Sequence, residues 1–145
     1  MRYKAFALFA ATIPAVASGQ GIRGLPPQVQ AEHQSNAREC TEMGNKLEIG
    51  PDYVLRTDFN GDGKTDYVLD WHALDCVGAA SLYGGSAGSP YDIFISSGER
   101  YIHSTVIGDD GALVRRGTRS VLRLAEKDGK THFWGWNGKA FARVN

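Results

Sequence analysis

Short runs in which apolar and polar residues alternate fill most of the chain after residue 50. These runs are rich in Val, Ile, Tyr, Phe and Trp, a composition typical of β-strands. They predict strands over residues 52–59, 66–74, 91–96, 101–108, 120–126, 131–136 and 140–144. Four dipeptides in the gaps predict tight turns: Ser97-Gly98, Asp110-Gly111, Asp128-Gly129 and Asn137-Gly138. The pattern therefore predicts a mainly β fold, as a small antiparallel meander or sandwich.

One segment ahead of the strands has helical character. Residues 28–43 are good helix formers, and Gly44-Asn45 supplies a stop signal, so we expect one short helix near the start of the domain. Residues 18–30 contain several glycines and prolines without an apolar period, which predicts a linker. The remaining residues, 31–145, are expected to form a single β-rich domain.

The first residues of the chain follow a third pattern. Arg2 and Lys4 precede an uncharged apolar run that ends in Ala15-Val16-Ala17, the small-x-small pattern that signal peptidase cleaves. Residues 1–17 are therefore expected to be a signal peptide, and their apolar run is too short for a stable membrane anchor. A buried N-terminal helix is the alternative. The expected location of the mature protein is periplasmic or secreted.

Export changes the interpretation of the two cysteines, Cys40 and Cys76. An oxidising compartment lets them form a disulfide bond that encloses residues 58–66, with two free thiols as the alternative. Because no C-x-x-C spacing occurs, thioredoxin-type redox chemistry and a zinc ribbon have no support.

The charge balance speaks against a nucleic-acid binder. The chain has 16 basic and 16 acidic residues, and removal of Arg2 and Lys4 with the signal peptide leaves the mature chain slightly acidic. A nucleic-acid partner would need a basic face. The one basic cluster lies within residues 115–123, and we interpret it as the solvated side of a hairpin, with a site for an anionic partner as the alternative.

The stretch "DFNGDGKTDYVLD", residues 58–70, carries the strongest chemical signal. Its oxygen-bearing side chains stand at positions 1, 3, 5 and 9 of a tight loop, and position 7 offers a backbone carbonyl: Asp58, Asn60, Asp62, Asp66 and Lys64. Ca²⁺ prefers several oxygen ligands, and clustered carboxylates repel one another without a cation. The stretch therefore predicts a calcium site, with a polar hairpin turn as the alternative.

The motif D-x-N-G-D-G-x-x-D, followed by an apolar β run, resembles the repeat motif of FG-GAP and VCBS-type domains over residues 52–72. The resemblance implies Ca²⁺ bound by Asp58, Asn60, Asp62 and Asp66 with the Lys64 carbonyl. An EF-hand would need Glu at position 12, where Leu69 stands, and would continue into a helix. Residues 126–136 hold a partial second copy, which we interpret as a bare hairpin turn. The whole chain is similar to small exported proteins of proteobacteria.

Catalytic patterns are weak. The four histidines show neither H-x-x-x-H nor H-E-x-x-H spacing, so a zinc hydrolase is unsupported. A triad could be drawn from His72, with Asp70 or Asp75 and a serine of residues 81–89, but no nucleophile elbow accompanies it.

Three functions stay open at this point. The first is an exported, calcium-binding, non-enzymatic domain that binds a protein or a glycan of the cell envelope. The second is a periplasmic inhibitor or immunity protein of a cell-wall enzyme, with residues 78–90 as the loop that would enter the enzyme's cleft. The third is a small hydrolase with structural calcium, which would need a pocket that holds His72 or His103 beside a carboxylate.

Overall fold

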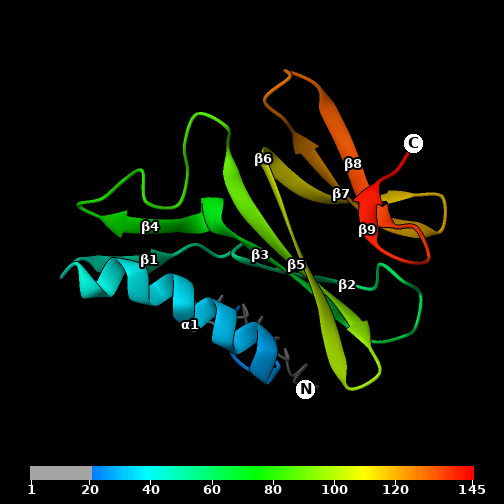
Figure 1. Ribbon diagram of the computed structural model, residues 1–145, viewed down its shortest axis with the longest axis horizontal. Coiled ribbons are helices and arrows are strands. Elements are labelled where there is room, and N and C mark those ends of the chain that lie inside the picture. Colours follow the sequence, from blue (N-terminus) through cyan, green and yellow to red (C-terminus); the bar gives the residue numbers. More distant parts are fainter. Residues whose placement is uncertain (1–20) are drawn as a thin grey trace, which may run out of the picture.

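The computed structural model describes residues 21–145, in which one α-helix is followed by nine strands and a short 3-10 turn (Figure 1). The predicted signal peptide lies outside the described residues. The elements are α1 (Pro27–Glu42), β1 (Lys46–Ile49), β2 (Val54–Thr57), β3 (Asp66–Asp70), η1 (Trp71–Ala73), β4 (Leu74–Val77), β5 (Ser89–Ser97), β6 (Arg100–Arg116), β7 (Arg119–Ala125), β8 (Thr131–Trp136) and β9 (Phe141–Arg143). The mainly β fold with one short helix is confirmed.

The strands form two antiparallel sheets. Seven of them follow one another as a meander in the order β2-β3-β5-β6-β7-β8-β9, while β1 and β4 pair in a small sheet of their own. The small sheet was not predicted from the sequence, because β1 is largely exposed and its four residues are too few for their polar–apolar alternation to stand out. The predicted strand 66–74 is interrupted by η1, which lies between β3 and β4.

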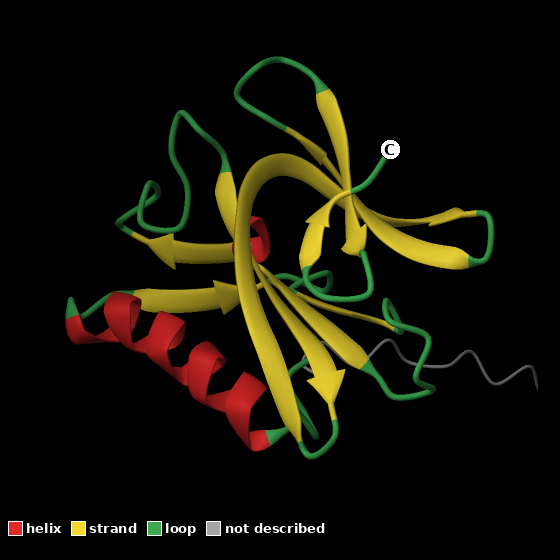
Figure 2. Cartoon of the chain, turned by 45° about the vertical axis from the view of Figure 1, so that its right-hand side comes forward, coloured by secondary structure: helices red, strands yellow, loops and turns green. Residues whose placement is uncertain are grey.

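The long strand β6 connects the two halves of the meander. Residues 100–108 pair with β5, and residues from Asp109 onward pair with β7. A register shift between Asp109 and Ala112 marks a β-bulge, where Asp110 has a φ of 52°. The strand arches over the molecule at this point (Figure 2), since a bulge bends its strand. The turn predicted at Asp110-Gly111 is therefore wrong: the chain continues as one strand through this dipeptide.

Because the meander curls over itself, β3 and β5 are buried on both faces. One core lies between the sheet and α1, and it includes Val29, Tyr53, Leu69 and Phe94. The other core lies on the opposite face under β7, β8 and β9, and it includes Val68, Tyr91, Ile93, Leu122 and Leu124. Seven of the first eight residues of β5 are buried, as expected for a strand covered on both sides.

The helix docks through one narrow face. Its buried residues, Val29, His33, Asn36 and Cys40, recur with helical spacing. The sequence predicted a helix over 28–43, and α1 agrees within one residue at each end, so the last residues of the predicted linker are helical. Cys40 forms the predicted disulfide bond with Cys76 of β4, with the two Cα atoms 5.7 Å apart. Within residues 21–145 no helix has the length and apolar character needed to cross a membrane.

Candidate calcium loop and neighbouring clefts

The predicted calcium loop connects β2 to β3, at the end of the sheet away from the bulge. Gly61 and Gly63 have φ angles of 75° and 80°, in the left-handed region that glycine adopts without strain. One carboxylate oxygen of Asp58 accepts the Gly61 N–H at 2.7 Å, and the other accepts the Gly63 N–H at 2.9 Å. Asp58 therefore closes the loop by binding the backbone of the two residues that allow it to curl.

The middle of the loop is built from side chains that accept from the backbone two residues later. Asn60 accepts the N–H of Asp62 at 3.1 Å, and Asp62 accepts the N–H of Lys64 at 2.8 Å. This backbone hydrogen bond is the main reason that the pKa of Asp62 is lowered. The ammonium of Lys64 donates to the Gly98 carbonyl at 2.7 Å and to no loop oxygen, although its charge contributes to the lowered pKa of Asp62.

Asp66 has a different role from the exposed part of the loop. It is completely buried, and its two oxygens accept the backbone N–H groups of Phe59 and Ser96, each at 2.7 Å. Ser96 also donates its hydroxyl to Asp62 at 2.8 Å and accepts from the Asn60 amide at 2.8 Å. Ser96 of β5 thus contacts three of the motif residues, a role that no local sequence signal announced.

The loop carboxylates share one electrostatic property. Among residues 21–145, the four ion pairs are Lys46–Glu48, His103–Asp92, His132–Asp128 and Arg143–Glu126, and none includes Asp58, Asp62 or Asp66. The negative charges of Asp66 and Asp62 also add to burial in raising the pKa of nearby Tyr101. The loop therefore concentrates negative charge without an ion pair among the described residues, although the charge of Lys64 contributes to the lowered pKa of Asp62.

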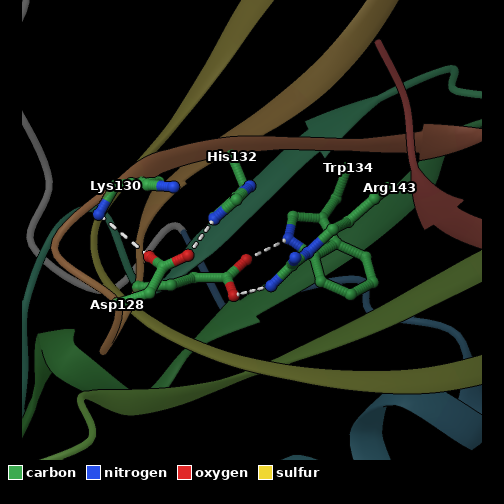
Figure 3. Close-up of polar contacts among 6 residues, drawn as sticks. Asp128, Lys130, His132, Trp134 and Arg143 are labelled. Carbon is green, nitrogen blue, oxygen red and sulfur yellow. Dashed lines mark hydrogen bonds and ion pairs between the residues drawn. The ribbon is translucent and has the colours of Figure 1, made fainter.

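The partial second copy of the motif provides an internal comparison (Figure 3). Asp128 accepts the Lys130 N–H at 2.9 Å, just as Asp62 accepts from Lys64, but its other oxygen pairs with the His132 ring at 2.8 Å. This contact is the main cause of the lowered pKa of Asp128. Glu126 is paired with Arg143 and accepts the indole N–H of Trp134 at 2.8 Å. In this second turn, basic side chains stand beside the acids.

The donor chemistry of residues 58–66 matches Ca²⁺, since it offers carboxylate, amide and carbonyl oxygens. Within residues 21–145 no three Asp, Glu, His or Cys side chains gather in a metal-binding arrangement. The reason is visible in the loop, where the aspartates direct their oxygens to N–H and O–H donors. Each oxygen keeps a further lone pair. The loop thus has the oxygen ligands that a hard cation prefers, and in this structure those oxygens accept hydrogen bonds from the protein.

A cleft of about 570 Å³ lies at the other end of β3, beside the bulge of β6. Its polar lining consists of Asp52, Asp70, His72, Tyr91 and Asp110. Asp70 accepts the His72 backbone N–H at 2.9 Å, and burial raises the pKa of its carboxyl to about 6. Burial likewise raises the pKa of Tyr91 to about 12, and its hydroxyl accepts the Gly111 N–H at 3.0 Å. The cleft therefore holds a carboxyl group that titrates well above its ordinary range.

The residues of the conceivable triad are only partly brought together. His72, Asp75 and Ser89 line a second cleft of about 380 Å³. Among residues 21–145, however, no hydrogen bond joins the His72 ring to either Asp75 or Ser89, and Ser89 is buried.

His103 does pair with a carboxylate, Asp92, at 2.9 Å. Asp92 is buried and also accepts from the Trp71 indole at 2.7 Å and the Thr105 hydroxyl at 2.6 Å. The His103 ring stacks on Phe94, with the ring centres 4.5 Å apart. These contacts form a structural network in which both oxygens of the Asp92 carboxylate have hydrogen-bond partners.

The segment proposed to enter an enzyme's cleft, residues 78–90, is anchored at its centre. Tyr83 is buried and donates its hydroxyl to the Asn36 carbonyl of α1 at 2.6 Å, while Gly85 and Gly88 exchange backbone hydrogen bonds. Exposed residues flank this anchor on both sides. The segment therefore packs against the helix instead of extending freely.

Comparisons of the chain with protein-family models, with curated proteins and with solved structures found no match.

Proposed function

We propose that the protein is an exported, non-enzymatic β-domain that binds Ca²⁺ in its 58–66 loop and binds a protein or glycan of the cell envelope. The observation that carries the metal part is the charge of the loop: its carboxylates form no ion pair among the described residues, whereas Asp128 of the second turn pairs with His132 and Glu126 pairs with Arg143. Asp58, Asn60, Asp62 and Asp66 would hold the ion with the Lys64 carbonyl. The ion would neutralise the loop and stabilise the β2–β3 connection.

Export is supported by two independent features. The disulfide between Cys40 and Cys76 suits an oxidising compartment. The charged start, apolar run and small-x-small end of residues 1–17 suit a cleaved signal peptide. Together they favour a periplasmic or secreted protein.

Thermal melting of the mature chain with Ca²⁺ and with a chelator tests the metal site. At a calcium concentration about ten times Kd, we expect Tm to rise by about 5 °C. Asp62→Asn keeps an acceptor for the Lys64 N–H but removes a charge, and it should abolish the rise. Asp128→Asn makes the same change in the second turn and should leave the rise intact.

Identical melting curves for the wild type with calcium and with chelator would remove the metal proposal. An equal loss of the calcium response in Asp62→Asn and Asp128→Asn would show that the effect is not local to the loop. A rise of the same size with Mg²⁺ would contradict a site selective for calcium.

The cleft at Asp70 favours a second candidate function, a small hydrolase with structural calcium. It places His72 beside a buried carboxyl group whose pKa of about 6 suits a general acid or base. Chromogenic ester substrates and peptidoglycan fragments provide the test. Turnover that is lost in Asp70→Asn would favour the hydrolase, and absence of turnover by the wild type would count against it.

A further inference from the structure

The first half of β6 carries an unusual contact on its outer edge. The backbone N–H of Tyr101 donates to the side-chain oxygen of Gln28 at 3.0 Å, and the side-chain amide of Gln28 donates to the Tyr101 carbonyl at 3.0 Å. Both backbone groups of Tyr101 therefore point away from β5. The carboxamide of Gln28, on the first turn of α1, occupies this edge in the way that a peptide group of a neighbouring strand would.

The same edge continues for three more rungs. In an antiparallel strand, every second residue directs its N–H and C=O to the same side. The backbone N–H and C=O groups of His103, Thr105 and Ile107 therefore point away from β5, like those of Tyr101. The next strand, β7, joins β6 only from Asp109 onward. Within residues 21–145, no strand pairs with this edge between Gln28 and the end of β7. We call this edge, residues 103–107, the slot; it offers the outward backbone groups of three residues.

The edge also lacks the charged residues and prolines that often protect such strands. Residues 101–108 contain no Pro, Lys, Arg, Asp or Glu, and Ile102 and Ile107 are 40% and 53% exposed. The two terminal strands of the sheet differ: β2 has four residues and includes Arg56, and β9 has three and includes Arg143. Natural proteins shorten or charge their edges to prevent unwanted pairing. A long, uncharged edge is typical of a surface that pairs with another strand.

We propose that this edge of β6, residues 103–107, binds a short extended segment of a partner protein by antiparallel strand addition. The proposal rests on the binding half of the proposed function and names its site. Such addition obtains affinity from main-chain hydrogen bonds and specificity from alternate side chains. Figure 2 shows β6 as one continuous, curved strand. Because β7 pairs with β6 from Asp109 onward, a segment bound at residues 103–107 would lie on the same edge of β6, in line with β7.

Charges at the two ends of the slot specify the partner's chemistry. Arg100 is exposed at the start of β6, and Asp109 and Asp110 are exposed past its other end. An antiparallel segment would begin beside the two aspartates and end beside the arginine. We therefore expect a partner segment with basic residues at its amino end, β-branched residues in its centre and acidic residues at its carboxyl end.

A second copy of this chain fits the slot less well than a short segment. The outward groups of Asp109 are already paired with β7, and those of Tyr101 with Gln28. A second β6 would bring its own β7 and Gln28 to the same edge, where they would meet those of the first copy. A chain end or an exposed loop of another protein carries no such flanking strand.

Fluorescence anisotropy with a defined probe tests the proposal. The probe is a labelled synthetic peptide with two lysines, five alternating valines and threonines, and two glutamates, in that order. Thr105→Pro removes one outward N–H without touching the pairing with β5. Thr105→Ala loses the same side-chain contact with Asp92 but keeps the N–H. We expect Thr105→Pro to weaken binding about tenfold or more and Thr105→Ala to stay within about twofold of the wild type.

Results of three kinds would overturn the proposal. The first is no binding by the wild type at about 1 mM peptide, or equal binding by Thr105→Pro and Thr105→Ala. The second is equal affinity for a peptide with the lysines and glutamates exchanged, which would contradict the orientation. The third is a dimer in sedimentation that Thr105→Pro dissociates, which would assign the edge to a second copy.

Two further measurements keep the outcome interpretable. Amide hydrogen exchange of the wild type should slow at His103, Thr105 and Ile107 when the peptide is added, which needs no variant. A calcium-dependent rise of Tm in Thr105→Pro shows that this variant is folded. If that rise persists in the wild type while the peptide fails to bind, the strand-addition site is wrong and the calcium loop stands.

Discussion

The backbone N–H of Ser96 donates to a carboxylate oxygen of Asp66 at 2.7 Å, in a place where Asp66 is completely buried. The other oxygen of Asp66 accepts the N–H of Phe59 at 2.7 Å. Both bonds are charge-assisted, and they connect the first residue of β3 to the preceding loop and to β5. Asp66 therefore stabilises the fold around the loop before any cation is considered, whereas exposed Asp62 has no comparable structural role.

Asp66→Asn should destabilise the protein even without calcium. An asparagine offers one acceptor where two N–H donors converge, and its amide group would face the second donor. We expect the free energy of unfolding in urea with chelator to fall by about 2–3 kcal/mol. Asp62→Asn, in the exposed part of the loop, should change it by less than about 1 kcal/mol. Equal effects of the two variants would contradict the division between a buried structural carboxylate and an exposed one.

The sequence predicted the 58–66 loop and several turns, because their shape depends on residues that are adjacent in the chain. Gly61 and Gly63 signalled a tight curl, and Asp128-Gly129 and Asn137-Gly138 signalled turns that the structure contains. The role of Ser96 could not be read in the same way. It comes from a strand 30 residues beyond Asp66, and only the pairing of β3 with β5 brings the two together.

The Asp110-Gly111 dipeptide shows where local chemistry misleads. Asp-Gly is a strong turn signal. Here the Gly111 N–H donates to the hydroxyl of buried Tyr91, and the flanking residues of β6 pair with β5 on one side and β7 on the other. Tertiary contacts thus extend the strand through the dipeptide and convert the expected turn into a bulge. The sequence suggested the pair of Asp70 and His72 but not the rest of the acidic cleft beside the bulge, because its residues come from four separate parts of the chain.

Gly111→Ala should be strongly destabilising because of the same contact. A Cβ atom at this position would lie 2.3 Å from the Tyr91 ring, and Tyr91 is completely buried. Because either the ring or the bulge would have to shift to admit the methyl group, we expect a loss of about 1–3 kcal/mol in urea unfolding. Gly85→Ala is the matched control: nothing lies within 4 Å of its Cβ position, and it should cost less than about 1 kcal/mol. A loss below about 1 kcal/mol for Gly111→Ala would mean that the bulge is able to relax.

The disulfide should account for a large part of the stability. It joins residues 36 positions apart and fastens the end of α1 to the small sheet. For a loop of this length, the chain-entropy model gives about 4 kcal/mol. We expect the double variant Cys40→Ala/Cys76→Ala to lose about that amount in urea unfolding relative to the oxidised wild type. Addition of a reductant should destabilise the wild type and leave the double variant unchanged; a response of the double variant would show that the effect is not due to the bond.

Asp70 should make the protein less stable as the pH rises. Burial raises the pKa of its carboxyl from 3.8 to about 6 in the folded protein, and the negative charge of Asp52 acts in the same direction. The folded state thus holds this proton more tightly than the unfolded state. The favourable contribution of protonated Asp70 is complete below about pH 4 and is lost as the pH rises through about 6.

The matching variant is Asp70→Asn, which retains an oxygen for the His72 N–H but carries no charge. At about pH 7.5 we expect it to unfold with up to about 3 kcal/mol more free energy than the wild type, and at about pH 4 with the same free energy. Urea unfolding of both proteins at the two pH values measures the difference directly, since other titrating groups cancel. A difference that does not change with pH would contradict the raised pKa of Asp70. The expected result would also mean that the chain keeps a destabilising carboxylate in the acidic cleft beside the bulge, as proteins do where a group serves binding or chemistry instead of the fold.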